Sequence, residues 1–316
     1  MMDKRLFLIL CALGAAGWVV PTAVRAQNTG AQPPATSQGM IGSAPTAAEK
    51  AMMAPTESDI YCAGFFTHRT ISPEIIVLGG QDNGLKFEFG AGEVVHLNQG
   101  KNKISAPGGQ YMLVRPTRDM NPTEAFPGQS VLVKQMGTHY AEIARIQVQV
   151  VNADSSIAEI LNACEPVLSG DVAIPLPARS APPYKTAPPM DRFAPSSGKS
   201  TGVIASIKEF REAAGEGDTV YLNTGSKQGA QPGAYLRVFR TYNTASQRII
   251  QMGTKQYLNQ VEGTQVGRKL TPEEINTLPR QVVGEVMILS VEEESAAGIV
   301  TYSWQDLYPG DQVEVE

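Results

Sequence analysis

The stretch that decides the fold is GDTVYLNTGSKQGAQPGAYLRVFR, residues 217–240, because a variant of it occurs earlier as GEVVHLNQGKNKISAPGGQYMLVR, residues 92–115. Each copy has a segment rich in β-branched and aromatic residues, a glycine-rich loop and a second apolar segment, which is the pattern of two strands joined by a turn. The repetition indicates an internal duplication. We therefore expect an all-β protein with two small modules that are β-barrel-like or β-sandwich-like.

The loops between the strands carry residues suited to tight turns. Glycine accepts positive φ, and proline fixes φ ahead of a turn, so these loops are expected to fold one strand back on the next. A phosphate-binding loop is disfavoured, since no Gly-Lys-Ser/Thr motif follows and no helix opens after the loop. The expected turn residues are Gly100, Pro107, Gly108, Gly170, Asp171, Gly225, Gly229, Pro232, Gly233, Gly310 and Asp311, with Asp311 bonding backbone groups of its own turn.

Composition divides the chain into segments. A basic start, an apolar run and a small-residue cleavage site predict an N-terminal signal peptide, and the apolar run is short for a membrane span of about 20 residues. An uncleaved anchor is the competing interpretation; we expect no stable transmembrane anchor. The segments are a signal peptide (1–26), a disordered low-complexity leader (27–57), a first β module (58–174), a proline-rich linker (175–200) and a second β module (201–316) with an insertion at 243–280. The linker is expected to be a semi-stiff spacer between the modules.

Three local patterns lead to more detailed expectations. IYCAGFF, from Ile60, has the residue types of a strand. The alternation in LKFEF, residues 85–89, predicts a hairpin strand that buries Leu85, Phe87 and Phe89 on one face. TPEEINTLP, residues 271–279, predicts a capped helical turn with Thr at the N-cap, Pro at N1 and Glu at N3.

Cys62 and Cys164 remain once the signal peptide, which carries the third cysteine, is removed. An even pair in an exported protein favours a disulfide, and two separate buried thiols are the alternative. A bond between them closes a loop of about 100 residues, for which chain entropy predicts about 4–5 kcal/mol of stabilisation.

Several classes of function are disfavoured by the sequence. The formal net charge is −5, with no basic face visible, which argues against nucleic-acid binding. His68, His96 and His139 are scattered and the cysteines lack close partners, so no metal site is predicted. No Gly-x-Ser-x-Gly motif is present, residues 292–294 are expected to form a solvated acidic turn, and no catalytic residue or cofactor is predicted.

Tyr302, Trp304 and Tyr308 form the one group of side chains that suggests binding. Exposed aromatic rings stack on sugars or contact partner proteins. Trp304, however, aligns with Cys164 of the first copy, and this favours a position in the core.

With these motifs in place, both copies resemble the C-terminal domain of the bacterial flagellar assembly protein T. The matching pattern is G-D-x-V-Y-L-N-x-G-x-x-x-G-x-x-P-G-x-Y-x-x-x-x-R at 217–240, then G-E-V at 284–286 and P-G-D-x-V at 309–313. The first copy matches more loosely, with Ile104 in place of Gly229. The resemblance implies a β module of periplasmic envelope proteins, and that family's other domains are missing here.

These observations favour a non-enzymatic scaffold, adaptor or assembly protein of the cell envelope. It would be periplasmic, associated with the outer envelope or secreted, and it would bind unidentified envelope proteins. A peptidoglycan- or glycan-binding protein is the alternative, and a secreted hydrolase is a more remote one, because the sequence offers no convergent titratable groups.

Overall fold

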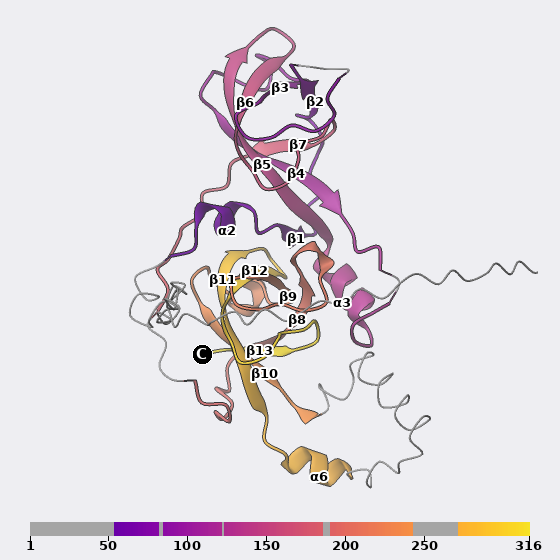
Figure 1. The fold of residues 1–316 in the computed structure, drawn as a ribbon, viewed down its shortest axis with the longest axis vertical. Helices are drawn as coiled ribbons and strands as arrows, with labels where there is room; N and C mark the ends of the chain where they lie inside the picture. Colours follow the sequence, from indigo (N-terminus) through magenta and orange to yellow (C-terminus); the bar gives the residue numbers. More distant parts are fainter. Residues whose placement is uncertain (1–53, 82–84, 122, 186–189, 243–270) are drawn as a thin grey trace, which may run out of the picture. The chain divides into compact units, whose positions relative to one another are not determined.

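The computed structural model describes residues 54–316 except 82–84, 122, 186–189 and 243–270. The predicted signal peptide, the leader up to residue 53 and most of the insertion therefore lie outside the described residues. Within them the protein is all-β, as predicted: a closed barrel of six strands is preceded by a seven-stranded antiparallel sheet (Figure 1).

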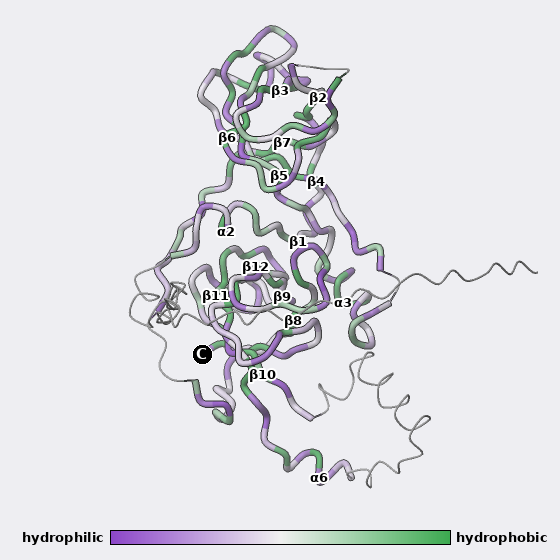
Figure 2. Tube along the Cα trace, viewed as in Figure 1, coloured by the Kyte–Doolittle hydropathy of each residue, from purple (hydrophilic) through white to green (hydrophobic). Residues whose placement is uncertain are grey.

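The second module is the closed barrel, with strand order β10-β11-β12-β9-β8-β13 and antiparallel pairing throughout. Its interior holds apolar side chains from every strand, and hydrophobic and hydrophilic residues interleave along the strands (Figure 2). The strands are β8 (Thr201–Ile207), β9 (Thr219–Leu222), β10 (Tyr235–Arg240), β11 (Gln281–Val291), β12 (Ala296–Ser303) and β13 (Gln312–Val315).

The first module repeats this topology, with strand order β2-β3-β6-β5-β4-β7, and β1 pairs with β5. The strands are β1 (Phe65–Thr67), β2 (Val77–Gly80), β3 (Val94–Leu97), β4 (Gln110–Thr117), β5 (Thr138–Val151), β6 (Ser156–Ala163) and β7 (Val172–Pro175). Val77 N donates to Asp171 O at 2.9 Å, as Ile204 N donates to Asp311 O at 2.9 Å in the second module. The same bond thus brings the first and last strands together in both modules, and we call them barrel 1 and barrel 2.

A buried ion pair is repeated at the last turn of each barrel. In barrel 1, Arg115 Nε lies 2.7 Å from Asp171 Oδ1, and in barrel 2, Arg240 Nε lies 2.6 Å from Asp311 Oδ1. Asp311 also accepts from Tyr308 N at 2.8 Å, which confirms that it bonds the backbone of its own turn. Charge-assisted bonds of this kind fix the last strand to β4 or β10.

The turn glycines act in two different ways. Gly229 and Gly233 have φ of 84° and 83°, so these positions need glycine for its conformational freedom, as predicted. Gly225, which could also have accepted positive φ, has a φ of −119°. Instead, a Cβ there would lie 2.5 Å from backbone atoms of Glu293, and Gly100 faces the equivalent hairpin of barrel 1 in the same way. Gly225 and Gly100 are thus sites of close backbone approach.

Two local expectations for barrel 1 are wrong. Residues 60–66 do not form one strand: Thr56 and Asp59 form a capping box that starts helix α2 (Glu57–Tyr61), and only β1 is extended. Leu85 and Phe87 are 92% and 80% exposed, and only Phe89 of the predicted stripe is buried. Phe89 forms an isolated bridge, so the alternation reflects a loop that touches the barrel at its end.

The helical turn predicted at 271–279 is confirmed as α6 (Pro272–Thr277). Thr271 Oγ1 accepts from Glu274 N at 3.3 Å, and Pro272 occupies the first turn. Beyond Pro175, which ends β7, the described linker residues form no strand, and they lie against the barrels. Arg179 pairs with Glu142 of β5 at 2.7 Å, and Lys185 N donates to the Tyr235 hydroxyl of β10 at 2.7 Å.

The two barrels meet at an apolar junction within one compact unit, Pro45–Glu316. Side chains from β1 and from α3 (Gln129–Met136) cover the outer face of barrel 2. The buried members of the junction are Ala63, Phe66, Met136, Ala205, Tyr221, Met287, Leu289, Ala297 and Ile299. Burial on both faces explains why all four residues of β9 are buried, whereas β3, its counterpart, alternates.

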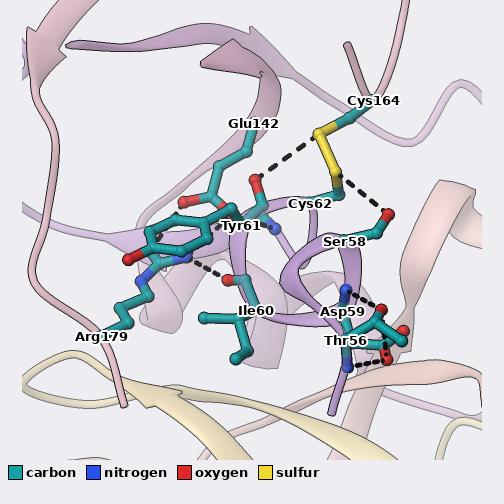
Figure 3. Close-up of a disulfide and its surroundings, with 10 residues drawn as sticks. Thr56, Ser58, Asp59, Ile60, Tyr61, Cys62, Glu142, Cys164 and Arg179 are labelled. Carbon is teal, nitrogen blue, oxygen red and sulfur yellow. Dashed lines mark hydrogen bonds and ion pairs between the residues drawn. A yellow bond between two sulfur atoms is a disulfide. The ribbon is translucent and has the colours of Figure 1, made fainter. Parts of the chain in front are cut away.

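The predicted disulfide between Cys62 and Cys164 is present, with a Cα–Cα distance of 5.5 Å. It attaches the end of α2 to the residue after β6 (Figure 3). Arg179 fastens the same segment from the linker side, because its guanidinium donates to Ile60 O at 2.6 Å. The segment that covers barrel 2 is therefore covalently bound to barrel 1.

Candidate functional site

Tyr302 and Trp304 lie together at the end of β12, where their rings meet edge to face with centroids 6.2 Å apart. The core position expected for Trp304 is wrong, because its side chain is 51% exposed. A β-bulge explains the difference. Val300 pairs with Val286 and Tyr302 with Glu285, so one residue of β12 is unpaired and the alternation shifts. The bulge turns the residues beyond it away from the barrel interior.

The linker supplies two further side chains to this surface. The guanidinium carbon of Arg192 lies 5.5 Å from the Trp304 ring centroid and 5.9 Å from that of Phe193. Phe193 is 55% exposed. Arg192 O accepts from Val282 N at 2.8 Å, which fixes the linker to the start of β11. We call Arg192, Phe193, Tyr302 and Trp304 the arginine–aromatic patch.

Local structure holds the patch in place. Asp191 Oδ1 accepts from Phe193 N at 2.9 Å and forms an Asx turn, and the next residue, Ala194, is buried. Arg280 donates to Ala194 O at 3.0 Å and to Pro195 O at 2.6 Å. The patch is therefore a fixed surface between linker and barrel.

The chemistry of the patch is that of a contact surface. Arg192 is exposed and has two ring contacts, and among the residues that the structure describes it has no acidic partner. Arginine, tryptophan and tyrosine are the residues enriched where protein partners bind most tightly. The patch can bind an apolar or aromatic group beside an anionic one.

Tyr308, the third aromatic candidate, does not join the patch. It is half-buried, and its ring lies 5.2 Å from the guanidinium of Arg240, which is paired with Asp311. Tyr308 therefore belongs to the last turn of barrel 2.

The sequence reasoning missed Arg192 and Phe193 because both lie in a segment interpreted as a spacer. A signal was present: Asp-Arg-Phe interrupts a run of prolines and small residues, and Asp two positions before Phe suits an Asx turn.

A cavity of about 110 Å³ lies inside the contact between the barrels. It is lined by Thr117, His139 and Glu142 of barrel 1, by Phe210 and Tyr221 of barrel 2 and by the disulfide. The Thr117 hydroxyl lies 2.5 Å from His139 Nδ1, and His139 Nε2 has no hydrogen-bond partner among the described residues. Burial lowers the pKa of His139 to about 4.

Glu142 is held by groups that build the junction. Its carboxylate pairs with Arg179 and accepts from Gly64 N at 3.0 Å. Burial raises the pKa of Glu142, and Arg179 opposes that shift. The Tyr221 hydroxyl donates to Ala63 O at 2.6 Å, so these polar groups hold the residues just ahead of β1 to both barrels.

The remaining candidate residues lie elsewhere. His96 is half-buried on β3, and residues 292–294 do not form a purely solvated turn as expected. Glu292 accepts from Thr67 Oγ1 at 3.0 Å, and Glu294 lies 3.1 Å from His68 Nε2, so this turn borders the junction. Within the described ranges, three or more His, Cys, Asp or Glu residues nowhere gather as they would around a metal ion.

The described helices are all too short or too polar to cross a membrane. The chain matches no protein-family model, and the curated proteins include no significant match to it.

Proposed function

We propose that this protein is a non-enzymatic scaffold or adaptor of the cell envelope that binds a partner protein through the arginine–aromatic patch. The observation that carries the proposal is the exposed stack of Arg192, Trp304 and Phe193, fixed between the linker and barrel 2. A surface that is already ordered loses little side-chain entropy on binding.

The rigid attachment of the two barrels supports the same proposal. The apolar junction holds barrel 2 against β1 and α3, and the disulfide and the Arg179–Glu142 pair fasten the segment ahead of β1 and the linker to barrel 1. An adaptor with a fixed geometry holds its partners at a defined spacing, which a freely jointed pair of modules would not do.

An enzymatic role has weaker support. The hydroxyl of Thr117 next to His139 is the one arrangement in the cavity that looks like a nucleophile with its base. A general base works best when its pKa is near the working pH, and burial lowers that of His139 to about 4. The Glu142 carboxylate, which could have served as a second group, is bonded to Arg179.

The disulfide also supports export, because such bonds persist in oxidising compartments. We propose that residues 1–26 direct the protein to the periplasm and that each barrel is a module of the type found at the C-terminus of flagellar assembly protein T. The matching motif residues form the strands and turns that the two barrels share. A different strand order in an experimental structure of that domain would contradict the family assignment.

The test is crosslinking in intact cells followed by mass spectrometry, with the wild type, Trp304→Ala and Met120→Ala. Met120 is 75% exposed and lies outside the patch, so it is the matched control. We expect an envelope protein that is recovered with the wild type and the control and is lost with Trp304→Ala. Equal recovery with all three would refute binding through the patch.

A glycan is the second candidate ligand, and the unexpected exposure of Trp304 favours it. An indole ring on the surface can stack on a sugar ring. Purified protein would be sedimented with purified sacculi, again with Trp304→Ala for comparison. If the wild type stays in the supernatant, the glycan proposal is wrong.

A further inference from the structure

Exposed apolar side chains lie close together on two surfaces of the described residues. One is the arginine–aromatic patch of barrel 2. The other is residues 85–89 of barrel 1, which we call tip loop 1, where Leu85 and Phe87 are almost fully exposed. The internal duplication shows how these two surfaces are related.

Tip loop 1 has a counterpart in barrel 2, residues 210–214, which we call tip loop 2. Lys86 pairs with Glu93 at 2.5 Å in the first loop, and Arg211 pairs with Asp218 at 2.7 Å in the second. Each loop ends on an isolated bridge to the segment that precedes the last turn of its barrel. The two loops are therefore the same structural element, present once in each barrel.

Tip loop 2 is already seated on barrel 1. The Phe210 ring meets the His139 ring edge to face, with centroids 5.4 Å apart. Thr117 and Cys164 line the same cavity as Phe210. The seat is the end of barrel 1 where β4 and β5 extend and where β1 runs beside β5.

The equivalent end of barrel 2 carries the arginine–aromatic patch. Trp304 aligns with Cys164, and Tyr242, which is 43% exposed, aligns with Thr117. The linker runs beside the start of β11 through the bond from Val282 N to Arg192 O, as β1 runs beside the start of β5. The patch thus corresponds to the seat, but no tip loop of this chain's described residues occupies it.

We propose that the arginine–aromatic patch of one copy receives tip loop 1 of a second copy, so that copies associate head to tail. This inference rests on the proposed function, because it names an occupant of the same patch. Charge complementarity supports it: tip loop 1 presents an exposed Glu88, and the patch presents Arg192. Such a contact joins two different surfaces, so each added copy leaves one of each free for the next.

The contact between copies is weaker than the junction within the chain. Tip loop 2 is supported by the apolar outer face of barrel 2, which includes Tyr221 and Ile299. The aligned residues of barrel 1 are His96 and Glu159, so the outer face of barrel 1 offers no such support. Association is therefore expected to depend on concentration. Because small interfaces are weak, it is best measured from about 1 µM to 1 mM.

Analytical ultracentrifugation of the purified protein tests the proposal with two variants that each disable one surface. Leu85→Glu changes the residue at the position of Phe210, so it disables tip loop 1 and leaves the patch intact. Trp304→Ala disables the patch and leaves tip loop 1 intact. We expect the wild type to form species beyond the dimer and each variant alone to stay monomeric. An equimolar mixture of the variants should associate again but stop at the dimer, because both remaining surfaces are then disabled.

A wild type that stays monomeric over the whole range, a mixture that stays monomeric, or a variant that assembles like the wild type would overturn the proposal. Met120→Glu introduces the same charge on an exposed side chain elsewhere and should assemble as the wild type does. Arg192→Glu replaces Trp304→Ala if that variant does not fold. A monomeric wild type whose crosslinked envelope partner still depends on Trp304 would refute self-association and leave the proposed function standing. A wild type that self-associates but has no envelope partner that depends on Trp304 would refute partner binding and leave self-association standing.

Discussion

Replacing Asp311 by alanine should destabilise barrel 2 much more than replacing Asp171 destabilises barrel 1. The Asp311 side chain is fully buried, and its removal leaves the guanidinium of Arg240, which is 10% exposed, without its carboxylate. Removing one member of a buried ion pair costs about 3–5 kcal/mol. Arg115 is 26% exposed and keeps Glu165 at 3.6 Å, so water and a second carboxylate compensate for the loss of Asp171. We expect about 1–3 kcal/mol there.

Urea unfolding of protein lacking residues 1–26 measures both effects. Trp304 is then the sole tryptophan and reports on barrel 2 by fluorescence, while circular dichroism follows both barrels. Lys103→Ala breaks an exposed pair with Glu74 and serves as the control, with an expected change below about 1 kcal/mol. Equal losses for the two aspartate variants, or a loss at Asp311 as small as that of the control, would refute the reasoning.

Three further predictions follow from the junction and the turns. Replacing both Cys62 and Cys164 by serine should lower the free energy of unfolding by about 4–5 kcal/mol, and free thiols in the non-reduced wild type, seen by mass spectrometry, would contradict the bond. His139 must take up a proton on unfolding at any pH between its folded pKa of about 4 and its unfolded value of 6.5, so the wild type should lose up to about 3 kcal/mol as the pH falls through this window. His139→Gln should lack that loss. Glu142, whose raised pKa acts in the opposite direction, is present in both proteins and so cancels in the comparison. Parallel curves of stability against pH for the two proteins would exclude a contribution from His139. Gly225→Ala should cost about 1–3 kcal/mol because its Cβ meets the Glu293 backbone, whereas Gly215→Ala, which faces open space, should be nearly neutral in the same thermal melts.

The duplicated strands could be predicted because period-two alternation and turn residues are local signals, and both copies carry them. The disulfide followed from the number of cysteines and the expected compartment. The exposure of Trp304 could not be predicted, since it depends on a bulge whose register is set by pairing with β11. Likewise, Leu85 and Phe87 have the alternation of a buried strand, yet nothing in the described structure packs over them.

Only part of the arginine–aromatic patch was predicted, because its members come from two distant segments of the chain. Tyr302 and Trp304 are two residues apart in the chain, whereas Arg192 reaches them only after barrel 2 has closed. Contacts between distant segments leave no periodic trace in a sequence. The close approach at Gly225 could not be predicted either, because the hairpin turn that it faces lies about 70 residues later in the chain.

The position of β1 has a consequence for how the chain can be made and cut. Ala63 and Phe66, which cover barrel 2, are synthesised before any strand of barrel 2 exists, and they are bound to barrel 1 by the disulfide. A fragment that ends after barrel 1 would therefore expose these apolar side chains to solvent, and exposed apolar surfaces promote aggregation. Cutting the chain at the linker should therefore yield an aggregation-prone fragment that contains barrel 1. A growing chain faces the same hazard until its last strand has been synthesised.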